Sequence, residues 1–297
     1  MKGAGELGAR VFGRVHGDLV VATTDGLDLV HASNQVRNPP RNSKLTTTLH
    51  DLTCWVMPEM HRAATVAGIL TNSVFGVIYS FTYMAVWAQN PDAGGYDVTD
   101  AVTYVWLGQA MIMTVAIWGG GATDELATRI RSGDVAIDLY RPVGLLGWWL
   151  ASDLGRATYH LLTRGLAPTV VGALLFDLRF PGGPLAWLLF AVSVPLAVVV
   201  SFGIRMLVSA SAFWLLDDAG VKNLQVVLAM FLSGLVVPLV LFPGWARDVA
   251  MALPWAAFLQ VPADIWLGQR AGWAAVEGLA FQAMWAAVLL GICQVVL

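Results

Sequence analysis

Long stretches without a single charged side chain constrain this sequence more than any other feature. Five of them cover residues 63–91, 101–123, 180–204, 223–246 and 278–297, and each holds 20 or more residues without Asp, Glu, Lys or Arg. A helix of about 20 apolar residues crosses the hydrocarbon core of a bilayer. The sequence therefore predicts an all-α polytopic membrane protein.

The composition excludes several other classes of protein. Only 12% of the 297 residues are charged and 57% are hydrophobic, whereas an ordinary soluble domain carries about 25% charged residues. We therefore exclude a soluble enzyme, a nucleic-acid-binding protein and a secreted disulfide-rich module. The two cysteines, Cys54 and Cys293, form no CxxC pattern, and the five histidines lack metal-ligand spacing.

The distribution of basic residues predicts the orientation. Residues 1–62 are polar and carry seven of the 17 Lys and Arg residues, so the positive-inside rule places this N-terminal extension in the cytoplasm. We expect the extension to be poorly ordered. Six spans are predicted, with the C-terminus also cytoplasmic, at about residues 64–88, 101–118, 158–176, 185–215, 224–242 and 273–297.

Arg164 interrupts the third predicted span, and a charge near mid-helix costs about 2.5–3.5 kcal/mol on insertion scales. Six spans would place 14 basic residues inside and three outside, and five spans would place 15 inside and two outside. Counting charges therefore does not distinguish the two topologies. The Phe180-Pro181-Gly182-Gly183-Pro184 turn favours a tight outside hairpin, and hence six spans.

The motifs of a membrane enzyme are missing. No lysine follows the glycines of a P-loop, so we expect this chain to bind neither ATP nor another cofactor. Ser233-Gly234 is similar to the GxSG motif of intramembrane serine proteases, but Phe231 replaces the first glycine and no histidine lies in a later span to act as base. Glu277 is the one acidic residue within a later span. It is either a carboxylate at the outer interface or a proton or substrate site.

Residues 122–142 form the most distinctive polar segment. Apolar residues here (Leu126, Ile130, Val135, Ile137 and Leu139) interleave with charged ones (Arg129, Arg131, Asp134, Asp138 and Arg141). Such a short amphipathic element can lie on the lipid surface or dock on a soluble partner. A solvated connecting loop is the alternative.

In this segment the sequence resembles a known family. Ile130-Arg131-Ser132-Gly133-Asp134, followed by Leu139-Tyr140-Arg141-Pro142, is similar to the I-x-S-G-x…L-x-R-P segment of bacterial ATP-binding-cassette (ABC) type 2 export permeases, in the branch that includes daunorubicin-resistance-like permeases. A second block agrees, with Ala212-Phe213-Trp214, Ser233-Gly234-Leu235-Val236-Val237-Pro238, Leu241-Phe242-Pro243, Leu253-Pro254 and Pro262. The resemblance covers about residues 63–297. The N-terminal extension is longer than the family's start, and the basic tail that usually follows the last span is missing.

The resemblance implies a multi-pass protein of the bacterial plasma membrane, paired with a second permease subunit, either identical or a paralogue. Two copies of a soluble ABC ATPase would bind ATP and magnesium and drive export of a hydrophobic or amphipathic substrate. The ATPase would contact a coupling segment that includes Arg129, Ile130, Arg131, Ser132, Gly133, Asp134, Asp138, Leu139 and Arg141. The translocation path or its gate would involve Ser233, Gly234, Pro238, Phe242, Pro243, Phe258 and Glu277. The alternatives are a membrane-embedded enzyme acting on lipids and a secondary transporter using Glu277 and Arg205.

Residues 243–272 are too long for a turn and too interrupted for a span. Pro243, Pro254 and Pro262 stand where each can open a short helix. A loop on the outer interface is one interpretation, and the resemblance favours a re-entrant helical pair outside, before the last span. In that pair, Trp245, Phe258 and Trp266 would supply apolar faces and Arg247, Asp248, Asp264 and Arg270 polar ones. We then expect Asp248 and Asp264, but not Phe258, to be accessible from outside.

Overall fold

A computed structural model describes residues 29–32, 44–47, 58–91, 93–139, 144–215 and 218–297. The chain divides into two units, Met1–Ala67 and Gly68–Leu297. In the first unit, strand β1 (Leu29–Ala32) pairs in parallel with β2 (Lys44–Thr47), with Leu29 opposite Lys44. The remainder of the predicted N-terminal extension lies outside the described residues up to Pro58, where the first helix begins.

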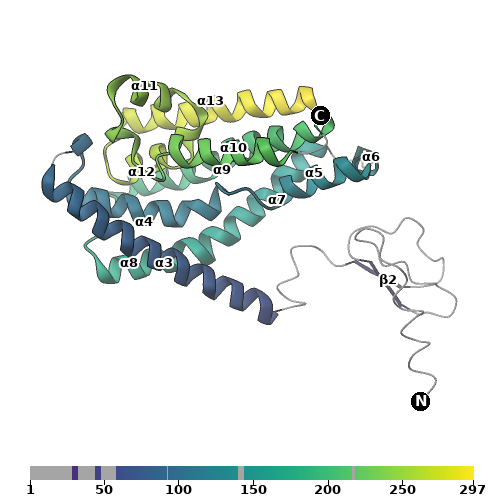
Figure 1. The fold of residues 1–297 in the computed structure, drawn as a ribbon, viewed down its shortest axis with the longest axis horizontal. Helices are drawn as coiled ribbons and strands as arrows, with labels where there is room; N and C mark the ends of the chain where they lie inside the picture. The colour runs from purple at the N-terminus through teal and green to yellow at the C-terminus, as the bar shows by residue number, and fades with distance from the viewer. Residues whose placement is uncertain (1–28, 33–43, 48–57, 92, 140–143, 216–217) are drawn as a thin grey trace, which may run out of the picture. The chain divides into compact units, whose positions relative to one another are not determined.

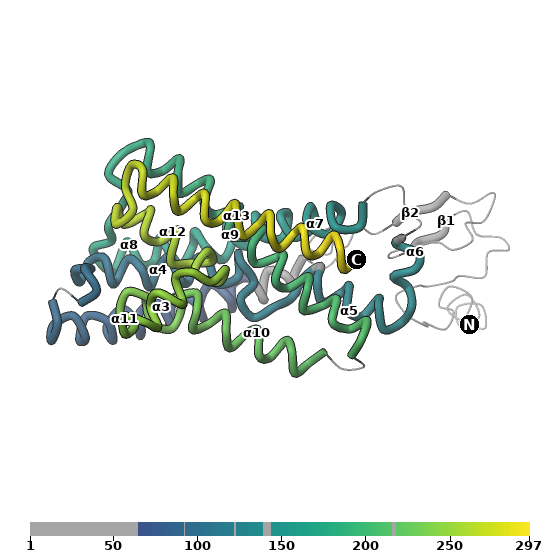
Figure 2. The backbone as a smooth tube through the Cα atoms, turned by 90° about the horizontal axis from the view of Figure 1, so that it is seen from above, coloured from purple at the N-terminus to yellow at the C-terminus, as the bar shows by residue number. Residues whose placement is uncertain are grey.

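The second unit is built from helices. In chain order they are α3 (Pro58–Gln89, which begins in the first unit), α4 (Val98–Thr114), α5 (Ala122–Ser132), α6 (Val135–Leu139), α7 (Leu145–His160), α8 (Leu166–Leu175), α9 (Pro184–Ala210), α10 (Ala219–Leu232), α11 (Gly244–Ala252), α12 (Gln260–Trp266) and α13 (Trp273–Val296). A π-helical stretch, Leu161–Gly165, joins α7 to α8. Short 3₁₀ helices lie at Ala93–Gly95, Ser211–Phe213, Leu239–Leu241 and Pro254–Ala257. Within this unit, α5 and α6 lie at one end and α11 and α12 at the other (Figures 1 and 2).

Helix α4 lies deep in this unit, with most of its side chains inaccessible. It begins at a capping box in which the Asp97 side chain accepts from the Asp100 backbone N–H and Asp100 accepts from that of Asp97. Trp106 occupies the middle of α4, against Gly76 of α3 and Gly172 of α8. A Cβ at either glycine would lie 2.7 Å or less from the indole ring, so the absence of a side chain at both positions lets the three helices approach closely.

Three described helical segments are long and apolar enough to cross a membrane: Thr65–Gln89, Pro184–Phe213 and Trp273–Val296. A fourth candidate is the pair Gly244–Ala252 and Pro254–Trp266, which is bent by 72°. The 185–215 prediction thus corresponds to α9 and the 3₁₀ turn after it. The continuous helix from α7 through the π-helical stretch to α8 contains residues 158–175 of the segment predicted at 158–176.

Two predicted spans are shorter than expected. Helix α4 ends at Thr114, not at residue 118, because Ala116 and the three glycines Gly119–Gly121 have positive φ and form a turn. Helix α10 ends at Leu232, not at residue 242, because Gly234 has a φ of +85° and Pro238 follows. The segment predicted to span 224–242 therefore holds the last nine residues of α10, a bend and the 3₁₀ helix Leu239–Leu241.

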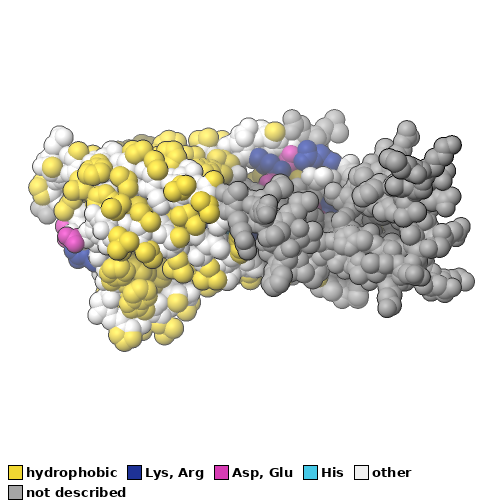
Figure 3. Space-filling model, turned by 90° about the horizontal axis from the view of Figure 1, so that it is seen from below, with side chains coloured by type: hydrophobic (Ala, Val, Ile, Leu, Met, Phe, Trp, Pro, Cys, Tyr) yellow, Lys and Arg dark blue, Asp and Glu magenta, His cyan; other side chains and the backbone are white. Residues whose placement is uncertain are grey.

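The surface of the helical unit suits a lipid environment. On the face shown in Figure 3, hydrophobic side chains predominate and the visible charged ones gather in two places. Large exposed hydrophobic residues recur along α3, α8 and α13, including Leu70, Phe81, Leu174 and Val295. Because soluble proteins rarely expose apolar surface on this scale, these helix faces fit contact with acyl chains.

Candidate functional site at the α5–α6 end

Helix α5 has the charge pattern of a stable short helix. Asp124 and Glu125 lie in its first turn and Arg129 and Arg131 in its last. The acidic residues are therefore near the positive end of the helix dipole and the basic residues near its negative end. Gly133 closes the helix in the left-handed conformation, with a φ of 80°. The chain then turns directly into α6.

An ion pair joins α5 to α6. The guanidinium of Arg129 binds the Asp138 carboxylate with both arms, at 2.5 Å from Nε and 2.8 Å from Nη2. The Asp138 side chain is only 4% exposed. Because a two-armed arginine–carboxylate pair fixes orientation as well as distance, it sets the angle between the two helices.

A second group of charges joins α5 to the start of α10. Arg131 Nη2 lies 3.2 Å from Asp218, and Lys222 Nζ lies 3.0 Å from Asp218 and 3.1 Å from Asp124. Burial lowers the pKa of Lys222, but the hydrogen bonds and charges of Asp218 and Asp124 outweigh it and raise that pKa above its ordinary value. Lys222 therefore stays charged at neutral pH and bridges the two helices.

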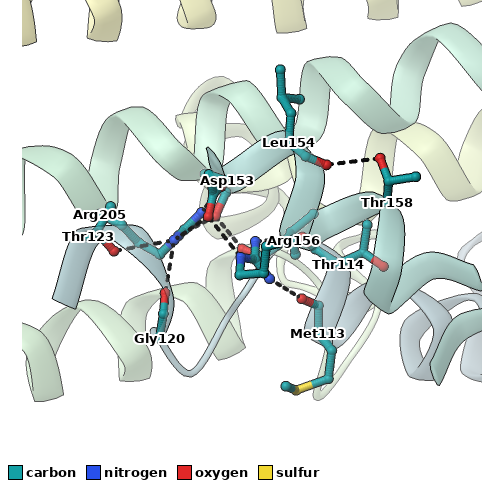
Figure 4. A network of polar contacts seen from close by, with 11 residues as sticks. Met113, Thr114, Gly120, Thr123, Asp153, Leu154, Arg156, Thr158 and Arg205 are labelled. Atoms are coloured by element: carbon teal, nitrogen blue, oxygen red, sulfur yellow. Dashed lines mark hydrogen bonds and ion pairs between the residues drawn. The ribbon is translucent and has the colours of Figure 1, made fainter. Parts of the chain in front are cut away.

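A polar cluster, here called the Asp153 cluster, lies behind the start of α5 (Figure 4). The carboxylate of Asp153 on α7 lies between two guanidinium groups, 2.5 Å from Nη2 of Arg205 on α9 and 2.8 Å from Nε of Arg156 on α7. Arg205 also donates from Nη1 to the Gly120 carbonyl at 3.4 Å and to the Thr123 hydroxyl at 3.3 Å. One carboxylate thus links α7 to α9 and, through Arg205, to the start of α5.

A different polar group, the α12 network, lies at the opposite end. Gln260 of α12 accepts from the Leu239 backbone N–H at 2.9 Å and donates to the Tyr96 hydroxyl at 2.8 Å and to Asp264 at 2.9 Å. The Tyr96 hydroxyl donates to the same Asp264 oxygen. The Tyr104 hydroxyl lies 3.0 Å from both the Gly234 carbonyl and Gln260 Oε1. This network ties α12 to α4 and to the irregular backbone after α10.

The sequence was compared with known protein families, curated proteins and solved structures. Residues 74–297, three-quarters of the chain, match the family described as ABC-2 family transporter protein. The chain belongs to the ABC-2 transporter family. Neither a curated protein nor a solved structure matches it. Permeases of the ABC-2 family generally partner with ABC ATPases, and this membership together with the apolar helices makes the chain a membrane protein.

In this ABC-2 protein, the predicted coupling residues gather at the α5–α6 end, but several of them face inward. Ile130 packs against a buried cluster that contains Trp149 of α7 and Phe202 of α9. Asp138 is buried in its pair with Arg129, so it holds α6 in place and is not a surface residue. The positions exposed on these helices are Thr128, Arg131, Ser132, Gly133 and Ala136. Asp134, half-buried, accepts from the Ser132 hydroxyl at 3.0 Å. Leu139 ends α6, and Arg141 lies outside the described residues.

The predicted gate residues of this ABC-2 protein divide into two groups. Ser233, Gly234 and Pro238 form the bend after α10, and Phe258 is fully buried in the same core cluster as Tyr96 and Tyr104. Phe242 is half-buried, packed against a small cluster around Leu239 and Ala250. Pro243 is exposed at the start of α11, and Glu277 is exposed on α13. The structure thus brings Ser233, Gly234, Pro238 and Phe258 close to the α12 network. Glu277, by contrast, takes part in none of the hydrogen bonds of that network.

The prediction that Asp264 is accessible from outside is wrong. Its polarity predicted an accessible face, but only 5% of the residue is exposed, because Tyr96, Gln260 and Arg270 surround its carboxylate. Arg247 and Asp248, by contrast, are exposed as expected. Sequence reasoning also missed Asp153, Arg156 and the two tyrosines of the α12 network. The spacing of Asp153 and Arg156 at i and i+3 beside an apolar stretch was the available signal.

Proposed function

We propose that this chain is the membrane-spanning subunit of an ATP-driven ABC exporter of the daunorubicin-resistance-like branch, and that a separate soluble ATPase supplies the energy. The exporter contains two permease subunits and two ATPase subunits in the bacterial plasma membrane. ATP and magnesium bind to the ATPase. The cargo is a hydrophobic or amphipathic molecule, drug-like or lipid-like.

The observation that supports this proposal best is the α5–α6 element. It is a pair of short charged helices at one end of the helical unit; one ion pair joins the two helices, and a second set joins α5 to the start of α10. Its exposed positions, from Thr128 to Ala136, are small or polar. A rigid, polar projection of this kind suits reversible docking on a soluble protein.

Charge supports the orientation. The α5–α6 end and its surroundings carry Arg129, Arg131, Arg156, Arg205 and Lys222, whereas the α11–α12 end carries Arg179, Arg247 and Arg270. The positive-inside rule favours the first end for the cytoplasm, where an ATPase has its ATP. With six crossings the two chain termini lie on that side as well, and the bent pair α11–α12 enters the membrane from outside.

Purification of the full-length tagged chain from its native host tests the proposal. We expect a P-loop ATPase to be recovered with it and the complex to hydrolyse ATP, while the isolated chain hydrolyses none. Arg131→Glu, at the exposed edge of α5, should reduce recovery of the ATPase. Arg247→Glu, the same change at an exposed arginine of the opposite end, should leave recovery unchanged.

Recovery of no ATPase by the wild-type chain would reject the proposal in favour of a secondary transporter or a lipid-acting enzyme. Equal recovery of the ATPase with the two variants would show that the docking site does not include Arg131 of α5. ATP hydrolysis by the isolated chain, with contaminating ATPases excluded, would contradict the division of labour between permease and ATPase.

A further inference from the structure

The Asp153 cluster has a composition that burial inside a protein makes costly. Arg205 is 3% exposed and Asp153 is fully buried, and Arg156 beside them is mostly buried. Two guanidinium groups share one carboxylate, so the cluster carries an excess positive charge. Charged groups buried to this extent are costly unless each is paired and fully hydrogen-bonded.

Main-chain carbonyls satisfy the excess charge. Arg156 donates from Nη1 to the Met113 carbonyl at 2.7 Å and from Nη2 to the Thr114 carbonyl at 3.1 Å. These carbonyls belong to the last turn of α4, where the helix dipole is negative. Ser201 of α9 donates to the next carbonyl, that of Val115, and accepts from Nε of Arg205. The cluster therefore caps the end of α4 and fixes it to α7 and α9.

The same cluster fixes the start of α5. Arg205 reaches Gly120 and Thr123, as described above, and a Cβ built on Gly121 would lie 2.6 Å from Cδ of Arg156. Gly121 also has a φ of +79°, which side-chain-bearing residues rarely adopt. The turn between α4 and α5 is thus pressed against the two arginines, and only a glycine fits at its closest point.

We propose that the Asp153 cluster is the joint that sets the position of α5 on the bundle and passes displacement of α5 to α4, α7 and α9. The part of this inference that concerns displacement rests on the proposed function, since the bound ATPase would displace α5. Asp153, Arg156 and Arg205 are positioning residues: their places behind α5 and at the end of α4 let one group of ionic contacts act on four helices together.

The first test uses the purified full-length chain alone, in lipid nanodiscs, by hydrogen–deuterium exchange. Arg205→Lys keeps the charge but loses the planar fork that reaches Asp153, Gly120 and Thr123 at once. Amides of the first turn of α5 should exchange about tenfold faster or more, since a hydrogen bond to a charged group contributes at least that factor to an equilibrium. Amides of α13 should not change.

Two further variants sharpen this test. Thr158→Ala is the matched control, because its hydroxyl sits on the same helix α7, is exposed, and bonds only to Leu154 of its own helix. It should leave exchange in α5 unchanged. Thr123→Val removes just the contact between Arg205 and the α5 side chain, so it should accelerate the same amides to a smaller extent. It also serves if Arg205→Lys does not fold.

The second test uses the complex with its ATPase, trapped with ATP and vanadate. In the wild type, trapping should change exchange in α4, and in Arg205→Lys that response should be lost although the ATPase remains bound. Unchanged exchange in α5 of both cluster variants would overturn the inference, and so would a nucleotide response of wild-type size in Arg205→Lys. If the wild-type chain binds no ATPase, the proposed function fails, while the exchange of the isolated chain still decides whether the cluster positions α5.

Discussion

Gly234 offers the sharpest test of the α12 network, because a single methyl group should break it. The residue has a φ of +85°, and an added Cβ would lie 2.3 Å from the Tyr104 hydroxyl and 3.0 Å from Gln260 Oε1. A left-handed backbone costs a non-glycine residue about 1–2 kcal/mol. Displacing Tyr104 from its buried hydrogen bonds costs about 1–3 kcal/mol more. Gly234→Ala should therefore destabilise the protein by about 2–5 kcal/mol.

Thermal unfolding of the purified protein in nanodiscs measures this effect. For a domain of this size, 1 kcal/mol shifts the midpoint by about 2–4 °C, so a loss of about 3 kcal/mol should lower it by about 6–12 °C. Gly220→Ala is the matched control. Gly220 lies in the first turn of α10 with nothing within 4 Å of an added Cβ, and alanine there should be neutral or slightly stabilising.

A double variant separates the steric contribution from the backbone contribution. Tyr104→Phe removes the oxygen that the new methyl group would strike, so Gly234→Ala should cost less in the Tyr104→Phe background than in the wild type. We expect the two changes together to fall short of their sum by about 1 kcal/mol or more. A Gly234→Ala variant as stable as Gly220→Ala, or strict additivity of the two changes, would refute this account.

Three other predictions follow from the described contacts. Asp138→Asn breaks the two-armed pair with Arg129 and should lower recovery of the ATPase about tenfold, at unchanged membrane insertion, in a co-purification assay. Because the pKa of Lys222 is raised, its ion pairs contribute stability that is fully present below about pH 10.5 and is lost as pH rises through the raised value. The Lys222→Gln variant should lack that alkaline loss when midpoints are compared between about pH 9 and pH 12. An impermeant thiol reagent should label a cysteine at position 248 but not one at position 264 in a cysteine-free background, because Asp248 is exposed and Asp264 is buried; labelling of both would contradict the buried network.

The sequence predicted the helical class, the proline-started helices of 243–272 and the amphipathic character of 122–142, because each depends on local composition. Pro243 precedes α11, Pro254 opens a 3₁₀ helix and Pro262 lies in the first turn of α12. The ends of α4 and α10 were harder to predict. They depend on positive φ at glycines, and a glycine in an apolar run fits a span or a break equally well.

The site was less predictable than the fold, because its contacts join residues far apart in the chain. Asp264 meets Tyr96 across 168 positions and Asp153 meets Arg205 across 52. Without those partners, a charged residue in an apolar segment is most simply taken as exposed, and that assumption failed for Asp264. Gln260 and Asp264, four positions apart in an apolar helix, were the local sign that one face of α12 is polar and buried.

The length of α4 has a consequence for electrical insulation. Its 17 residues span about 26 Å, less than the hydrocarbon thickness of about 30 Å. With a polar cluster at either end, the low-dielectric layer that would resist ion leakage through this protein is thinner than the lipid around it. The resistance to ion leakage then depends on how tightly the interior excludes water, and the indole of Trp106 fills the space between Gly76 and Gly172 in the middle of α4. Replacing Trp106 with a small side chain should therefore raise the ion conductance of vesicles that contain the protein.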